Sequence, residues 1–117
     1  MNNDEKEIDE LLNALNEEQT ISFDLGTPHL TESNSFKKLI AIGPSAVPHL
    51  LRLLQLHPTK KITAYIVKAL GQLSDKSAIK YLVDLQTSFQ QHEPIDMWDY
   101  AVIGQCKIAI DNLEKKS

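Results

Sequence analysis

The side chains that could support chemistry in this chain are few, and they lie far apart in the sequence. No two of its four histidines fall at the i, i+4 spacing with which one helix holds a metal ion. These histidines are His29, His49, His57 and His92. The chain has one cysteine, Cys106, whereas structural zinc sites usually take two or more thiolates. We therefore predict no metal site and no cofactor.

No set of residues predicts catalysis either. Cys106 falls on the apolar stripe of the last expected helix, where a thiol is buried and unreactive. The glycines do not cluster as in a phosphate-binding loop, since they stand at positions 26, 43, 71 and 104. Glu93, Asp96 and Asp99 lie together, but no other feature supports the paired carboxylates of a hydrolase. We expect no enzymatic activity and infer no small-molecule substrate.

The acidic residues around position 96 have two interpretations. They open the last expected helix, where negative charge is favourable beside the helix N-terminus, and Trp98 then packs inward. Alternatively they form a partner-binding patch with Trp98 and Tyr100, because aromatic side chains often anchor interfaces. We keep Asp96 and Asp99 as candidate partner-binding residues.

Charge is distributed unevenly along the chain. Residues 1–30 carry eight acidic side chains and one lysine, whereas residues 31–117 carry eight acidic and eleven basic ones. The acidic segment is either a solvated helix surface or a face that attracts a basic partner protein. The basic residues concentrate at Lys60, Lys61, Lys68, Lys76 and Lys80. Because the whole chain has a net charge of −4, we read these lysines as a solvated surface and do not expect nucleic-acid binding.

Length and composition favour a single soluble domain. The chain has 117 residues, of which 42% are hydrophobic and 24% charged. It lacks the long apolar run of a membrane span and the basic, apolar start of a signal peptide. With one cysteine and no possible intrachain disulfide, the sequence favours a cytoplasmic location.

Apolar periodicity predicts about six helices and no competing strand pattern. The first helix is expected over residues 4–16, where Ile8, Leu11, Leu12 and Leu15 share one face. Residues 17–30 are expected to form an ordered loop, although Ile21, Phe23 and Leu25 alternate as in extended backbone. The later helices are expected over residues 31–42, 45–56, 59–73, 77–90 and 95–115. Thr31 or Ser33, Ser45 and Thr59 are the expected caps of three of them.

A helical unit occurs twice, about 31 residues apart, as in stacked helix pairs. The copies contain I-G-P-S-A-V-P-H-L-L over residues 42–51 and A-L-G-Q-L-S-D-K-S-A over residues 69–78. These stretches resemble HEAT repeats, most closely the short variety named after phycobilisome bilin lyases. Residues 100–106 resemble 63–69, the first helix of a repeat.

The resemblance implies an all-α fold, a short right-handed α-α superhelix within one domain, 1–117. Residues 31–94 would form two helix-hairpin repeats. Residues 1–30 would add an N-terminal capping helix plus a loop, and residues 95–117 a C-terminal capping helix. In such stacks the second helix of each pair usually lines the concave face. The candidate outward residues there are His49, Arg52, Gln55, Lys80, Asp84 and Thr87.

We therefore expect a non-enzymatic protein–protein interaction module of HEAT type, with another protein as partner. A more specific alternative is an immunity protein that neutralises a basic nuclease toxin, suggested by the small size and the acidic first helix. A second alternative, suggested only by the type of repeat, is a bilin-lyase-like or chromophore-binding protein. The few aromatic residues, 6% of the chain, argue against that alternative.

Overall fold

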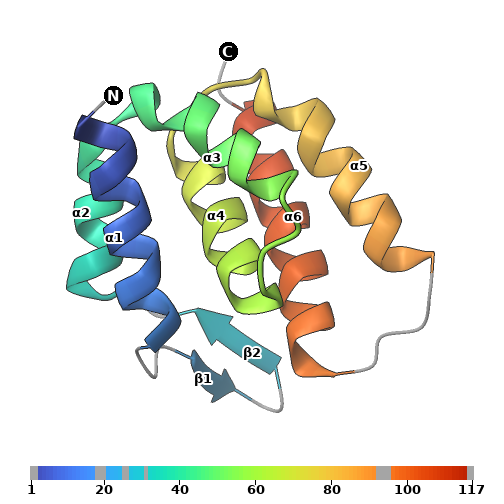
Figure 1. Cartoon of the computed structure of the whole chain (residues 1–117). Helices are drawn as coiled ribbons and strands as arrows, with labels where there is room; N and C mark the ends of the chain where they lie inside the picture. Colours follow the sequence, from blue (N-terminus) through green and yellow to red (C-terminus); the bar gives the residue numbers. More distant parts are fainter. Residues whose placement is uncertain (1–2, 18–20, 25–26, 31, 92–95, 116–117) are drawn as a thin grey trace.

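The computed structural model describes residues 3–17, 21–24, 27–30, 32–91 and 96–115. These residues form six α-helices and one small hairpin (Figure 1). The helices are α1 (Asn3–Glu17), α2 (Asn34–Ile42), α3 (Val47–Leu54), α4 (Lys60–Gln72), α5 (Ala78–Gln90) and α6 (Met97–Lys115). A 3₁₀ turn over Pro44–Ala46 leads into α3. The prediction of a helical fold with six helices is confirmed for the part of the chain that is described.

The segment expected to be a loop over 17–30 contains a two-stranded antiparallel hairpin instead. Strand β1 (Ile21–Asp24) pairs with β2 (Thr27–Leu30), with Ile21 opposite Leu30 and Asp24 opposite Thr27. The alternating sequence favours this extended backbone, and pairing satisfies its hydrogen-bonding groups. The remainder of the expected loop, residues 18–20 and 25–26, lies outside the described residues.

Two of the expected helix starts are confirmed, and one is wrong. The Ser33 hydroxyl accepts a hydrogen bond from the Phe36 amide, and the Thr59 hydroxyl accepts one from the Ile62 amide. Ser45 does not cap a helix, because it lies inside the 3₁₀ turn that Pro44 begins. Helix α3 therefore starts at Val47, with no side-chain cap at Ala46.

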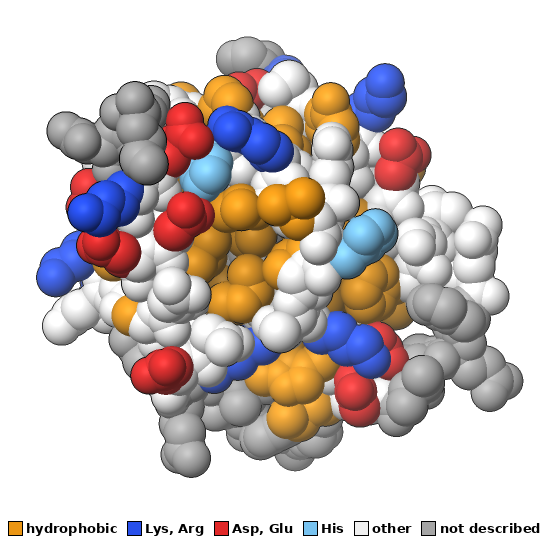
Figure 2. Space-filling model, viewed as in Figure 1, with side chains coloured by type: hydrophobic (Ala, Val, Ile, Leu, Met, Phe, Trp, Pro, Cys, Tyr) orange, Lys and Arg blue, Asp and Glu red, His pale blue; other side chains and the backbone are white. Residues whose placement is uncertain are grey.

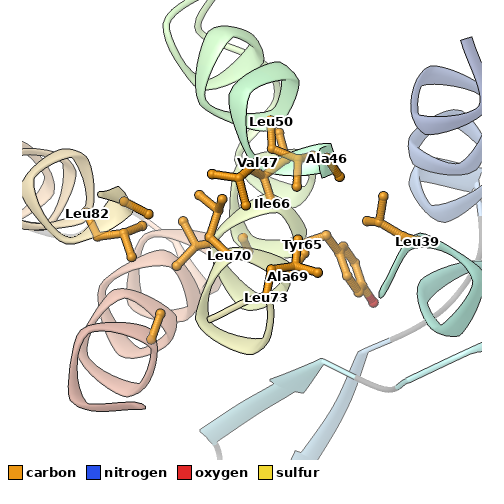
Figure 3. Close-up of a cluster of buried hydrophobic side chains, with 14 of the residues drawn as sticks. Leu39, Ala46, Val47, Leu50, Tyr65, Ile66, Ala69, Leu70, Leu73 and Leu82 are labelled. Carbon is orange, nitrogen blue, oxygen red and sulfur yellow. The ribbon is translucent and has the colours of Figure 1, made fainter. Parts of the chain in front are cut away.

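Helix α4 lies at the centre of the molecule and contacts α1, α2, α3 and α6. Its side chains from Thr63 to Val67 are buried, because neighbouring helices cover it on several sides. Figure 3 shows part of this core, a single cluster that combines buried side chains of α4 with Leu39 of α2, Leu50 of α3 and Leu82 of α5. A core built around one helix fixes the relative positions of the others, including the helices that line the site described next.

The closest helix contact joins α4 to α6. A Cβ atom added at Gly71 would lie 2.7 Å from the Ala109 Cβ atom and 2.8 Å from its Cα atom. Glycine therefore permits an approach that any larger residue would obstruct. Both residues are buried, so this contact is closed to solvent.

Candidate functional site

A groove of about 480 Å³ opens on one face of the molecule between α1, the end of α3 and the start of α4. In the space-filling view, hydrophobic side chains lie in a hollow at the centre of that face, between α1 and α3 (Figure 2). The groove is lined by Asp9, Leu12, Asn13, Asn16, Leu53, Leu56, Pro58, Thr59 and Ile62. A concave apolar surface with a few polar groups is the usual form of a binding site.

Helix α1 supplies a polar wall to this groove. Asp9, Asn13 and Asn16 follow one another at spacings of four and three residues, so they form one row along the helix. Leu12 lies beside that row and turns into the core, where it is buried. Helix α1 therefore places exposed polar side chains next to an apolar surface of the groove.

The end of α3 supplies the most exposed apolar side chain of the groove, Leu56. The chain continues past Leu54 in a tight turn, in which the Leu56 amide donates to the Leu53 carbonyl. His57 then takes a positive φ of 54°, and the chain reverses into α4. The chain turns away from Leu56 there, and this side chain is 70% exposed.

Charged residues join α1 to α3 beside the groove. The His49 Nε2 atom lies 2.9 Å from the Asp9 Oδ1 atom, and its Nδ1 atom lies 3.4 Å from the Glu5 Oε1 atom. Arg52 lies 3.5 Å from the same Glu5 oxygen. Two acids of α1 therefore contact two side chains of α3, of which Arg52 carries a positive charge.

The expectation that His49 faces outward is wrong, since only 9% of this residue is exposed. The reason is tertiary: α1, 40 residues earlier in the chain, covers it and supplies its carboxylate partners. Arg52 is exposed on the same helix and Gln55 is exposed directly after its end, but neither is among the residues that line the groove. Their role in partner binding stays a prediction.

The remaining candidates of the second repeat lie elsewhere. Lys80, Asp84 and Thr87 are exposed on α5, as expected, but they do not line the groove. Figure 1 places α5 on the opposite side of α4 from α1. The α5 candidates therefore lie outside the groove, although α5 itself contacts α3.

Asp96 and Asp99 form a reciprocal cap at the start of α6. The Asp96 carboxylate accepts hydrogen bonds from the Trp98 and Asp99 amides, and the Asp99 carboxylate accepts one from the Asp96 amide. Lys60 of α4 lies 2.9 Å from Asp99 and 3.3 Å from Asp96. The hydrogen bond to Asp99 raises the pKa of Lys60.

These contacts correct the expectation of an exposed acidic patch at Asp99. Only 4% of Asp99 is exposed, because it faces Lys60 and its own helix start. Asp96 is exposed, so a role in partner binding remains a prediction for it.

Several lysines of the expected basic surface make contacts within the chain. Lys60 pairs with the two aspartates, and Lys61 donates to the Asn16 carbonyl oxygen at 3.0 Å. Lys68 lies 3.6 Å from Glu32 and sits over the Phe36 ring, 5.7 Å from its centroid. These three lysines therefore stabilise the packing of α4 against its neighbours.

Cys106 is buried, as predicted, and burial raises the pKa of its thiol to about 12. A thiol in this environment stays protonated at neutral pH and is a poor nucleophile.

Among the described residues, no cluster of three histidine, cysteine, aspartate or glutamate side chains is arranged to hold a metal ion. In the same part of the chain, no helix combines the length and apolar character needed to cross a bilayer.

The apolar floor of the groove was not predicted from the sequence; it is formed by Leu12, Leu53, Leu56 and Ile62. One signal for it is present in the sequence. Leu56 immediately precedes the His57–Pro58 break, so it is a large apolar residue at a place where the helix cannot continue to cover it.

Comparison with models of known protein families, with curated proteins and with solved structures found no match to this chain.

Proposed function

We propose that this protein is a non-enzymatic protein-binding module, with the groove between α1, α3 and α4 as its docking surface. The observation that carries the proposal is Leu56, which is 70% exposed beside an apolar floor and a polar wall. Exposed apolar surface with a polar rim is typical of interaction sites. Covering a leucine side chain contributes up to about 2 kcal/mol, so Leu56 is a suitable anchor for a partner.

The charge of helix α1 as a whole favours a basic partner. Helix α1 contains six acidic residues and one lysine, and Glu7, Asp9, Glu10 and Glu17 are exposed on it. Negative potential of this kind attracts a positively charged protein and raises its association rate. Arg52 and Gln55, exposed near and just after the end of α3, are then proposed secondary contacts, and Lys80, Asp84 and Thr87 on α5 are a predicted contact region outside the groove.

The helix order is consistent with a HEAT-like stack, and we propose this architecture as the scaffold of the groove. In it, α2 followed by α3 and α4 followed by α5 are the two proposed repeats in chain order, α6 is a third first helix, and α1 caps one end. The contacts of α2 with α4, of α4 with α6 and of α3 with α5 support this arrangement. The groove then lies at the capped end of a short right-handed superhelix.

A second candidate function is that of an immunity protein in the cytoplasm, whose partner is a basic nuclease toxin. The acidic surface of α1 favours it, because such a surface can oppose the nucleic-acid-binding face of a nuclease. Stoichiometric inhibition of a captured nuclease would identify this function, whereas a captured partner without nuclease activity would exclude it.

The proposed function can be tested by site-specific photocrosslinking. A photoreactive amino acid is placed at position 56 in one variant and at position 108 in another. Ile108 is a matched control, because it is also an exposed aliphatic residue, 54% exposed, and it lies in a different hollow between α5 and α6. Both variants are irradiated in native lysate, and captured proteins are identified by mass spectrometry and then purified.

The expected result is a protein captured from position 56 and not from position 108, which forms a saturable complex with the purified wild-type chain. Equal capture from both positions, or a captured protein that does not bind in purified form, would contradict the assignment of the groove.

A further inference from the structure

We infer that the partner inserts a basic amphipathic α-helix into the groove; the inference rests on the groove being the docking surface. The lining supports a helical occupant in three ways, through the length of its wall, the spacing of its apolar residues and the state of its backbone. The charge of the side chains around the groove supports a basic occupant. Each of these features involves described residues of α1, α3 and α4.

The wall matches the dimensions of a short helix. Asp9 and Asn16 are seven residues apart on α1, so the row spans about 10 Å, or about two helical turns. Leu12 lies within that span on the side of the floor. A row of this length accommodates side chains at positions i, i+3, i+4 and i+7 of an approaching helix.

The floor provides matching apolar contacts. Leu53 and Leu56 are three residues apart at the end of α3, and Ile62 faces them from the first turn of α4. Leu56 stands at the edge, so a helix lying between it and α1 would cover it. Such a helix would pack its own apolar stripe between two ridges, which is the usual geometry of helix packing.

An extended peptide is a poorer fit, because it binds by adding to an open sheet edge. The groove residues of α1, α3 and α4 have their backbone groups within helices. Between the helices, the Leu56 amide donates to Leu53, Pro58 has no amide hydrogen, and the Thr59 carbonyl accepts from Thr63. The described lining therefore offers no row of backbone groups for a strand.

The charge of the occupant follows from the charges that surround the groove. The Asp9 side chain is 55% exposed at the rim, although its Oδ1 atom contacts His49. Two basic groups near the groove have partners within the chain, since Arg52 pairs with Glu5 and Lys61 donates to the Asn16 carbonyl oxygen. A partner helix that brings arginine or lysine against the α1 wall therefore gains attraction, whereas an acidic helix meets like charge.

Three synthetic peptides of about 14 residues test this inference, a length at which isolated helices become possible. The first has leucine at i, i+3, i+4 and i+7 and arginine or lysine at most other positions. The second has the same composition with leucine at alternate positions, which gives an extended amphipathic pattern. The third keeps the helical stripe but has glutamate in place of the basic residues. Binding is measured by calorimetry, and contacts are mapped by amide chemical shifts.

The expected result is that the basic helical peptide binds at least about tenfold more tightly than the other two. Its shifts should centre on Leu12, Leu53 and Ile62. Leu56→Glu should weaken it about tenfold or more, because the apolar anchor is lost and a negative charge now faces the apolar stripe. The matched variant Ile108→Glu should leave it unchanged. Both substitutions are at exposed positions, and thermal melting verifies that each variant is folded.

The inference is overturned if the alternating peptide binds as tightly, if the acidic helix binds equally well, or if no peptide binds at the groove. Crosslinking at position 56 reports separately on the proposed function. If a partner is captured at position 56 but the basic helical peptide does not bind, the helical occupant is rejected and the groove remains the proposed docking surface. Absence of capture would reject the docking surface.

Discussion

The α4–α6 contact and the α1–α3 contact join helices in opposite ways. At the first, Gly71 and Ala109 bring two backbones so close that an added methyl group has no space. At the second, His49 and Arg52 join α3 to the Glu5 and Asp9 carboxylates through long polar side chains. Small residues therefore allow α4 and α6 to pack closely. Polar side chains connect α1 to α3 instead, and the groove lies open beside that contact.

This difference indicates which interface contributes more to the free energy of unfolding and which one lies beside a surface that can bind a partner. When a close-packed contact is disturbed, dispersion energy and buried apolar area are lost. Such a contact also has no space for another molecule. A polar contact at the surface is weaker, but it leaves apolar side chains such as Leu56 accessible. Substitutions in each region should therefore have different consequences, and the largest effect is expected at the closed interface.

The first prediction concerns Gly71. Gly71→Ala should lower the free energy of unfolding by about 3 kcal/mol, because the new methyl group meets the Ala109 backbone and forces α4 and α6 apart. Urea denaturation measures the change. The matched control is Gly104→Ala in α6, where a Cβ atom would have no neighbour within 4 Å. It should be neutral or add up to about 1 kcal/mol through helix propensity. Equal effects of the two substitutions would contradict the close approach.

The second prediction concerns the polar interface. His49→Ala should cost about 2 kcal/mol, since the buried imidazole is lost and the Glu5 and Asp9 carboxylates lose their partner. Hydrogen exchange should show faster opening of α1 than of α6. Thr87→Ala, at an exposed position of α5, serves as the control and should change stability by less than about 0.5 kcal/mol. Uniform acceleration across all helices would show that His49 does not act on the α1–α3 contact specifically.

The third prediction tests the start of α6. Asp96→Ala should cost about 1 kcal/mol, because two amides at the start of the helix lose their acceptor. Asp96→Asn keeps an acceptor oxygen and should retain most of that stability. Thermal melts of the two variants measure the difference. If Asn and Ala are equally destabilising, the charge toward Lys60 contributes more than the cap does.

The smallest effect is expected at the turn between α4 and α5. The Ser77 hydroxyl and amide donate to the Asp75 carboxylate and lower the pKa of Asp75. A carboxyl whose pKa is lower in the folded state stabilises the fold above its usual pKa and loses that contribution as the pH falls. The stability difference between wild type and Asp75→Asn should therefore be constant above about pH 5 and shrink as the pH falls from there to about pH 3 and below. A constant difference over that range would contradict the assignment.

The sequence predicts the helices of this fold better than it predicts the site. Local signals are sufficient for helix starts such as those at Ser33 and Thr59, because each cap bonds to an amide three residues later. The hairpin over 21–30 depends on pairing between two short strands, and only the alternation of apolar residues indicates it.

The site depends on contacts between distant parts of the chain. Periodicity places His49 on the outer side of its helix, but α1 covers that side through contacts 40 residues apart in sequence. Asp99 is buried for a similar reason, since Lys60 of α4 faces it. The groove likewise combines residues of three helices, so the local pattern indicates the exposure of Leu56 before the His57–Pro58 break but not the floor as a whole.

The most direct test of the central claim is the affinity of the protein captured through position 56 for two charge variants of this chain. If the groove is the docking surface, Leu56→Glu should weaken binding about tenfold or more, while Ile108→Glu leaves the dissociation constant unchanged. Equal affinities for both variants, in chains whose melting temperatures match the wild type, would contradict the claim.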